Sequence, residues 1–394
     1  MTAIFTPRDA AGLRERLAGR VILPGQEGYD AARHVWNASH DYRPALIAQP
    51  LSVAEVQAAV RFAADRGLPV SVRGGGHNHA GYAVADGALM LDLSAMVSVR
   101  VDPARRVATV SGGATWGTVD QATQRAGLAV TGADVSPVGV GGVTLGGGVA
   151  QVLVERQRVG GDELFLRVML VTAPPAPFIP EPLRGRPAVV LSAAWFGTAG
   201  RGESALRELR EFGPQAGDLL RPMSYVQLQS MQDAAVPRRV RAASGGGFTG
   251  PLDGGVIEAV TSAAAQPPPM SMVELQPMGG AVARISPDAT AFRYRRAAHL
   301  LAVLTAAPPE DPPAEQAAWA EKVDGSLPAG TILGPSVHAM GRDEPEDQVR
   351  AAYGAAAYAR LTAVKHAYDP GNLFRFNQNI RPQAQAKCPS VEDA

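Results

Sequence analysis

The sequence has one cysteine, Cys388, and no long run of apolar residues. A single cysteine excludes an intramolecular disulfide, which fits a reducing compartment. No apolar stretch reaches the ~20 residues that a transmembrane helix needs. Residues 1–19 lack the apolar core of a signal peptide. We therefore expect a soluble, cytoplasmic protein.

The sequence also lacks an excess of either charge, because 37 basic residues balance 37 acidic ones. This balance disfavours nucleic acid and anionic membranes as partners. The 43 glycines and 32 prolines follow no collagen-like period, and no internal repeat is visible. With 394 residues, 46% of them hydrophobic, the chain can bury a large core, in two domains or one elaborate one.

The first clear pattern is a strand, a helix and a second strand. The helix is expected over residues 52–67, because Ser52 and Glu55 have capping-box spacing and a glycine supplies the stop. Short apolar strands flank it at residues 42–50 and 68–74. Ligands collect beyond the carboxyl ends of parallel strands, so we expect a site just after the second strand.

Two glycine clusters follow. Residues 70–87, VSVRGGGHNHAGYAVADG, place three glycines directly before His77. A backbone without side chains beside an imidazole suits a phosphate-bearing cofactor, a metal site or a crowded turn. Residues 135–151 hold six glycines between Gly139 and Gly148, open enough for amides to approach a pyrophosphate. This second cluster lacks the glycine spacing and the following acidic residue of a Rossmann fingerprint.

The remaining chain reads as alternating strands and helices. An antiparallel pair is expected around Asp102, where Pro103 marks a turn. Beyond a proline-rich loop at 174–187, further strands are expected at residues 188–197, 271–278 and 281–286. Helices are expected at residues 200–213, 314–323 and 346–368.

Four segments together resemble a known family: residues 46–96, 111–120, 139–148 and 368–380, the last reading YDPGNLFRFNQNI. In combination they are similar to the FAD-linked oxidases of the berberine-bridge-enzyme-like group, in the vanillyl-alcohol-oxidase superfamily. The resemblance implies an α+β fold, with a two-subdomain PCMH-type FAD-binding domain and an α+β substrate domain built on an antiparallel sheet. The domains expected are residues 1–173 for FAD, 174–345 for substrate, and 346–394 returning to the FAD-binding domain.

The resemblance also implies the cofactor, FAD, and how it is held. His77 would bond covalently to the 8α-methyl of the flavin, although a glycine turn with a surface histidine is the alternative. Val135 stands where relatives carry a second, cysteinyl tether, so attachment is expected through histidine alone. Further contacts to FAD are expected from Arg73, Gly74, Gly75, Gly76, Asn78, Gly81, Tyr82, Gly139, Gly141, Gly142, Thr144, Gly146, Gly147, Asn377 and Asn379. The two asparagines are equally compatible with a strand that closes the domain.

The catalytic base is less clear from the resemblance. Ser336 stands where relatives carry a tyrosine, and His338 where they carry an asparagine, on what we expect to be a strand. His338 can abstract a proton at neutral pH, although a lone histidine on a strand is often structural. Glu274 and Tyr294 are further candidates, as is Tyr225, and each could equally be an ordinary core residue. No metal site is expected. His79 is expected to be a loop or pocket residue, and Arg295 a structural residue.

Two departures from the family leave alternatives open. A block of the flavin domain that relatives carry after the second glycine cluster is missing, and Gly245, Gly246 and Gly247 replace an aromatic strand. We expect an oxidase that acts on an alcohol, a sugar or a polycyclic natural product and passes electrons to O2. The alternatives are a non-redox scaffold, such as a cyclase or isomerase of natural-product biosynthesis, and an inactive remnant.

Overall fold

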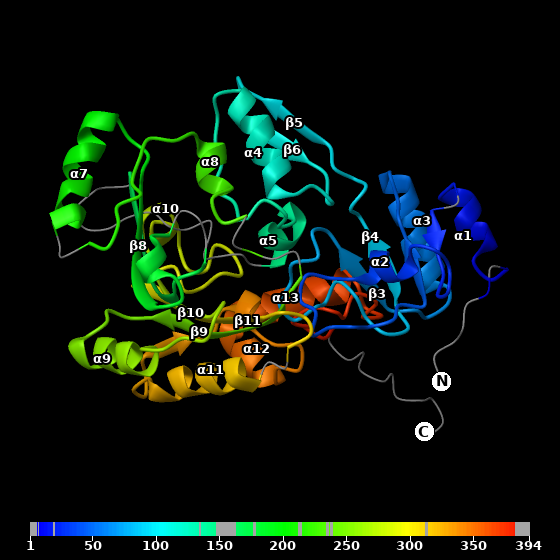
Figure 1. The fold of residues 1–394 in the computed structure, drawn as a ribbon. Coiled ribbons are helices and arrows are strands. Elements are labelled where there is room, and N and C mark those ends of the chain that lie inside the picture. Colours follow the sequence, from blue (N-terminus) through cyan, green and yellow to red (C-terminus); the bar gives the residue numbers. More distant parts are fainter. Residues whose placement is uncertain are drawn as a thin grey trace.

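The computed structural model describes residues 8–18, 20–133, 135–146, 163–175, 179–211, 215–233, 239–311 and 314–382, with Thr6 and Val236. These residues form three β-sheets with helices around them (Figure 1). None of the helices in these ranges is both long and apolar enough to span a bilayer. The mixture of helices, a mainly parallel sheet and a large antiparallel sheet confirms the expected α+β class.

The first sheet is four-stranded and buried. Its order is β1-β2-β4-β3, with β2 and β3 both parallel to β4. Every residue of β2 and β4 is buried, and helices α1 and α3 pack on the sheet through Leu13, Phe62 and their neighbours. The elements are β1 (Val21–Ile22), β2 (Leu46–Ala48), β3 (Val70–Arg73), β4 (Leu89–Asp92), α1 (Ala11–Arg16), α2 (Tyr29–Arg33) and α3 (Val53–Ala64).

The expected strand-helix-strand unit is confirmed. Ser52 caps α3, because its hydroxyl accepts a hydrogen bond from the Glu55 amide at 3.2 Å. Gly67 follows the helix with φ +61°, which suits a glycine stop. Strand β4 lies between β2 and β3, so the two strands of the unit are not neighbours in the sheet.

The second sheet is the expected antiparallel pair, β5 (Val99–Asp102) with β6 (Val107–Val110). Helix α4 (Trp116–Arg125) lies beside it, and α5 (Val140–Gly146) follows in the second glycine cluster (Figure 1). The pair is half exposed, since 53% of Val107 is accessible to solvent. Within the described ranges no third strand joins it.

The third sheet is antiparallel and six-stranded, in the order β12-β9-β11-β10-β7-β8. Helices α9 (Gly254–Ala263) and α11 (Ala314–Ser326) cover one face, where Trp319 packs with Val273 and Leu301. Figure 1 shows both helices below the sheet. The strands are β7 (Leu164–Thr172), β8 (Pro187–Trp195), β9 (Arg241–Thr249), β10 (Met272–Pro277), β11 (His299–Ala307) and β12 (Ile332–Gly334).

Strand β7 pairs with β8 and β10, so the large sheet begins before residue 174. The division of the chain at residues 173 and 345 stays a prediction. The remaining elements are η1 (Glu181–Leu183), α7 (Ala199–Glu211), α8 (Tyr225–Gln229), α10 (Gly280–Ala283), η2 (Val337–Ala339), α12 (Glu346–Tyr353) and α13 (Ala355–Tyr368).

Three local predictions were wrong. Residues 281–286 are not a strand, because β10 ends before Gly279 and helix α10 follows. Residues 346–368 are two helices, α12 and α13, separated by Gly354 at φ +76°. The segment with Ser336 and His338 is not a strand either. Proline 335 cannot donate to a ladder, so β12 stops at Gly334 and the 3₁₀ turn η2 follows.

The three glycines of β9 have a packing reason. A Cβ on Gly245 would lie 2.5 Å from a carboxylate oxygen of Asp324 on α11. Gly246 has φ +84°, and a Cβ there would overlap the Leu301 carbonyl of β11. A Cβ on Gly247 would lie 2.5 Å from the Gly334 carbonyl of β12. The glycines therefore allow close approach of neighbouring elements.

Candidate functional site

The candidate site is a cavity of about 3120 Å³ between the first two sheets and the large sheet. Its walls include the loop after β3, the residues leading into α5, strands β7 and β8, and one face of β10. Alternate residues of β10 divide between two faces: Glu274 and Gln276 line the cavity, and Val273 faces α9 and α11. An ordinary small-molecule pocket has about 300–1,000 Å³, so this one has room for a large cofactor and a substrate.

The two glycine clusters meet in the cavity wall. A Cβ on Gly75 would overlap the Gly139 amide nitrogen and lie 2.7 Å from the Pro137 carbonyl oxygen. A Cβ on Gly74 would lie 3.1 Å, and one on Gly141 3.2 Å, from the carbonyl oxygen of Gly112, after β6. Three loops therefore touch backbone to backbone, and side chains are excluded from their contact. This bare backbone suits the phosphates and ring of a dinucleotide.

His77 stands at the end of this glycine wall. Its imidazole stacks on the indole of Trp36, with ring centroids 5.5 Å apart and an interplanar angle of 19°. Burial, and then the charges of His79 and Arg73, lower the pKa of His77 to about 4. The ring is therefore neutral at pH 7, and one of its nitrogens keeps a free lone pair. A neutral imidazole at a glycine wall fits covalent attachment of FAD.

His79 also contacts the indole of Trp36. Its ring meets Trp36 edge-on at 5.3 Å, and its carbonyl oxygen accepts hydrogen bonds from Asn37 Nδ2 at 2.6 Å and His40 Nε2 at 2.9 Å. Burial, and then the charge of His40, lower the pKa of His79 to about 4. The side chain lines the cavity, as one of the two expected positions requires.

The loop after His77 is fastened by Arg342, which follows η2. Its guanidinium donates to the carbonyls of Ala80 at 3.0 Å, Gly81 at 2.6 Å and Val84 at 2.9 Å. The same group lies over the rings of Tyr42 and Tyr82, at 4.2 and 5.1 Å. Sequence reasoning missed Arg342, because nothing local links it to a loop more than 250 residues earlier.

Most of the expected cofactor residues line the cavity: Gly74, Gly75, Gly76, His77, Asn78, Tyr82, Gly139, Gly141, Gly142 and Asn377. Arg73, Gly81, Thr144 and Asn379 do not, and the surroundings of Gly146 and the whole of Gly147 lie outside what the structure describes. Their roles toward the cofactor stay predictions.

Two of these residues have other positions in the structure. The Arg73 guanidinium donates to the Ala32 carbonyl at 2.5 Å and lies 3.9 Å from Asp92. Gly81 has φ +64°, and a Cβ there would overlap the ring of His40. Both residues therefore shape the loop from behind the cavity wall.

The catalytic candidates separate into two groups. His338 and Glu274 line the cavity, whereas Tyr294 does not. The Tyr294 hydroxyl donates to the Ala351 carbonyl at 3.1 Å, and its ring stacks on Phe248 at 4.9 Å. The structure therefore gives Tyr294 a packing position and no access to a bound substrate.

His338 is held by its neighbour Ser336. The Ser336 Oγ lies 2.8 Å from Nδ1 of His338, which leaves Nε2 as the nitrogen available for proton exchange. Burial, and then the charge of His79, lower the pKa of His338 to about 4. The ring is neutral at pH 7 and can accept a proton there.

Glu274 is not isolated in the cavity wall. Arg167 of β7 places Nη1 3.6 Å from its carboxylate, and the Gln276 amide donates to the same oxygen. Tyr225 also lines the cavity, with its hydroxyl bonded to the Val130 carbonyl at 2.7 Å. Arg295 is buried and donates to Thr290 at 2.7 Å, a structural position as expected. No group of three or more metal-ligating side chains occurs in the part of the chain that the structure describes.

Comparison with known proteins gives matches at both ends of the chain. Residues 44–170 match the FAD binding domain family, and residues 334–381 match the family described as berberine and berberine like. The chain is 40% identical over 157 residues to (R)-6-hydroxynicotine oxidase of Paenarthrobacter nicotinovorans, covering 40% of this chain and 34% of the relative. It is 41% identical over 125 residues to glucooligosaccharide oxidase of Sarocladium strictum, covering 31% of this chain and 25% of the relative.

These two alignments span about a third or less of each relative's length. The fold extends further. The structure of 6-hydroxy-D-nicotine oxidase from Arthrobacter nicotinovorans has a TM-score of 0.77 and 23% identity, and the match covers 92% of this chain and 98% of that one. The expected resemblance is confirmed as a similarity: the chain matches the FAD binding domain family at residues 44–170 and the berberine-like family at residues 334–381, and it is similar in sequence to FAD-linked oxidases of the berberine-bridge-enzyme-like group.

Proposed function

We propose that this protein is an FAD-dependent oxidase whose flavin is tethered through His77. The observation that carries the proposal is the neutral His77 imidazole at the end of a wall built from two glycine clusters. A protonated imidazole has no lone pair with which to form a bond to the flavin. The lowered pKa therefore keeps His77 competent for attachment across the neutral range.

The chain's own residues would hold the cofactor at two places. Gly74, Gly75, Gly139 and Gly141 supply bare backbone for it, and His77 supplies the tether. Bound FAD provides the acceptor for a hydride removed from the substrate and returns the electrons to O2 as hydrogen peroxide. Val135 carries no thiol, so it offers no second tether to the flavin.

We assign the proton-accepting role to His338. Its Nε2 is available because Ser336 engages Nδ1, and the ring is neutral above about pH 4. Glu274 is engaged by Arg167 and Gln276, which suits a residue that orients substrate polar groups. The proposed substrates are small organic molecules with an oxidisable C–H bond beside oxygen or nitrogen, since the two relatives are named for nicotine and oligosaccharide oxidation.

The first test concerns the flavin. The purified protein should show a flavin spectrum, the yellow colour should stay with the acid-precipitated pellet, and peptide mass spectrometry should find FAD on His77. The His77→Ala variant should release its flavin into the supernatant, whereas His299→Gln, a histidine of β11 outside the cavity wall, should keep it. A folded but colourless protein would contradict the proposal and favour a scaffold without flavin chemistry.

The second test concerns the base. Peroxide release would be measured with a panel of secondary alcohols, oligosaccharides and cyclic amines. The His338→Gln variant should lower kcat on the best substrate by about 10²–10⁴-fold, the usual value of a positioned acid or base. Ser336→Ala should lower it less, because the imidazole remains and only its orientation is freed. Equal turnover by His338→Gln and the unaltered protein would remove His338 from the reaction.

A further inference from the structure

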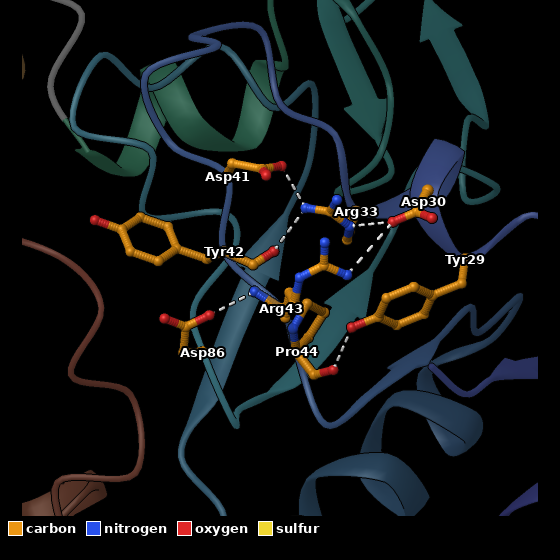
Figure 2. A network of polar contacts seen from close by, with 8 residues as sticks. All are labelled: Tyr29, Asp30, Arg33, Asp41, Tyr42, Arg43, Pro44 and Asp86. Carbon is orange, nitrogen blue, oxygen red and sulfur yellow. Dashed lines mark hydrogen bonds and ion pairs between the residues drawn. The ribbon is translucent and has the colours of Figure 1, made fainter. Parts of the chain in front are cut away.

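Residues 34–40 form a segment whose two ends are joined by one side chain, and the sequence alone did not single it out. Arg33, at the end of α2, is buried, and its guanidinium reaches over the segment to its far side. It donates to Asp30 at 2.7 Å, to Asp41 at 2.5 Å and to the Tyr42 carbonyl at 3.2 Å (Figure 2). Both ends of residues 34–40 are thereby joined through one side chain.

The surroundings of this closure are fixed as well. The Arg43 amide donates to Asp86 at 2.6 Å, and the Tyr29 hydroxyl donates to the Pro44 carbonyl at 2.6 Å (Figure 2). Both contacts hold the residues that follow the segment, close to the starts of β2 and β4. The segment is therefore a rigid support, and Trp36 and Asn37 lie on it.

Trp36 contacts the tether residue in two ways. Its indole stacks on the His77 ring, and its backbone amide donates to the Gly76 carbonyl at 3.1 Å. Stacking covers one face of the imidazole and does not cover the ring edge that carries the nitrogens, and both residues line the cavity. Because the bond to a flavin forms in the ring plane at a nitrogen, the stack is compatible with attachment.

Asn37 joins the same loop to the large sheet. It is buried, with 1% exposed, and its Nδ2 donates to the carbonyls of His79 at 2.6 Å and Ala242 at 2.7 Å. Its Oδ1 accepts from the amides of Ala242 at 3.0 Å and Ser39 at 3.1 Å. Three of these four bonds join the loop after His77 to β9, and the fourth, from Ser39, lies within the segment.

We propose that Trp36 and Asn37 are positioning residues for the tether. Trp36 orients the His77 ring, and Asn37 fixes the position of the His77 loop relative to the large sheet. The inference rests on the proposed function, because the geometry is read as preparation for flavin attachment. A stacked ring keeps one orientation, so the nitrogen spends more of its time directed at the cofactor. Water is also excluded from the covered face.

The step that these residues would promote joins a His77 nitrogen to the 8α-carbon of FAD. One hydrogen leaves the imidazole nitrogen and one leaves the 8α-methyl group, while two electrons pass into the flavin ring. O2 then takes up the two electrons and two protons as hydrogen peroxide, and the flavin returns to its oxidised form. The chain supplies only the neutral, oriented imidazole.

The experiment compares Trp36→Leu, Trp36→Phe and Asn37→Ala in the full chain, each expressed with ample flavin. The readout is the fraction of bound FAD that stays with the acid-precipitated protein, with the circular dichroism spectrum and Tm recorded for each variant. We expect Trp36→Leu to lower the covalent fraction at least tenfold, with FAD still bound non-covalently, and Trp36→Phe to keep more than half of it. Asn37→Ala should lower the covalent fraction as well.

The matched control is Trp319→Leu, which removes a buried indole from α11, away from the tether. It should lower the Tm and leave the covalent fraction of the folded protein unchanged. An unchanged covalent fraction in Trp36→Leu would overturn the inference. So would a loss in Trp319→Leu as large as that in Trp36→Leu, because it would show a general effect of stability.

A second readout needs no flavin. In flavin-free protein with labelled histidine, an NMR titration follows the pKa of His77, which burial holds at about 4. Trp36→Leu should raise this pKa toward 6.5 by at least one unit, because removing the indole opens the ring to water; an unchanged pKa would overturn the inference. If the unaltered protein carried no FAD on His77, the proposed function would fail while this titration would still decide the positioning role.

Discussion

The first two sheets each deliver a glycine turn to the cavity, and they differ sharply in burial. The four-stranded sheet ends in Gly74–Gly76 after β3 and is buried throughout β2 and β4. The two-stranded sheet ends in Gly112 after β6 and has mostly half-buried or exposed side chains. The same type of loop is thus carried by a rigid support on one side and by a lightly packed one on the other.

This difference indicates which residue of the site must be held in a fixed position. The residue that would bond to the cofactor follows the buried sheet, and the turn that supplies only backbone follows the exposed one. Local stability varies across a structure, and segments with few buried apolar contacts open most easily. The exposed pair is therefore expected to open more easily than the sheet that carries His77.

The largest expected effect is in the buried sheet. Leu89→Ala in β4 removes a fully buried side chain from the core cluster that also holds Leu46 and Val70, so it should cost about 3–5 kcal/mol of unfolding free energy. Urea unfolding followed by circular dichroism measures it. A cost below about 1 kcal/mol would show that the first sheet is not the rigid support that the comparison requires.

The second effect concerns three histidines of the cavity wall: His77 and His79, which follow the buried sheet, and His338, which follows β12 of the large sheet. In flavin-free protein His77, His79 and His338 have pKa values of about 4, against 6.5 for an unfolded chain. The unfolded chain therefore binds more protons between these values. The stability of the folded state is complete above about pH 6.5, falls as the pH falls through this window, and levels off below about pH 4.

His338→Gln should remove the contribution of one histidine to this pH dependence of stability. A pKa lowered from 6.5 to about 4 corresponds to at most about 3 kcal/mol for one histidine. Urea unfolding of both proteins at several pH values across the window gives the two slopes. Parallel curves for the variant and the unaltered protein would mean that the cavity admits water to His338.

The third effect tests how far the His77 loop depends on a distant segment. Arg342→Ala removes charge-assisted hydrogen bonds to three loop carbonyls, so it should cost about 2 kcal/mol and speed the release of any untethered FAD. Arg342→Lys should restore little, because one ammonium cannot reproduce the guanidinium fork. Thermal unfolding and FAD dissociation rates measure both variants. Full recovery of stability and FAD retention in Arg342→Lys would show that Arg342 acts only through its charge.

The smallest effect is expected in the exposed pair. Val107→Thr in β6 changes a side chain that is 53% exposed, so it should alter stability by less than about 0.5 kcal/mol. The covalent FAD fraction should not change. A loss above about 1 kcal/mol would show that the two sheets unfold together and would remove the contrast between them.

The local patterns of the chain predicted much of the fold. Helix α3 and strand β3 were readable because Ser52, Glu55 and the following glycine act within a few residues of each other. The loop with His77 could be recognised because three adjacent glycines stand directly before a histidine, just after a strand. The strand expected at 281–286 failed for a physical reason: glycines 279 and 280 end β10, and Val282 is buried against Phe248 from a helical turn.

The residues that hold the site in place could not be predicted from the sequence. Asn37 bonds a residue 205 positions away, and Arg342 bonds one 258 positions away, and neither carries a local signal. Tyr294 was expected at the substrate because of its residue type, but its hydroxyl bonds Ala351 outside the cavity. Residue type and spacing located the loop, and only the packing showed what holds it.

The long reach of Arg342 has a consequence for how the protein is made. Val84 and Arg342 are separated by 258 residues, which a ribosome adds in roughly 13–50 s at ~5–20 residues per second. During that interval the loop with His77 has left the ribosome without its guanidinium clamp. The tether geometry is therefore complete only after most of the chain has been synthesised, so flavin attachment is expected to follow translation.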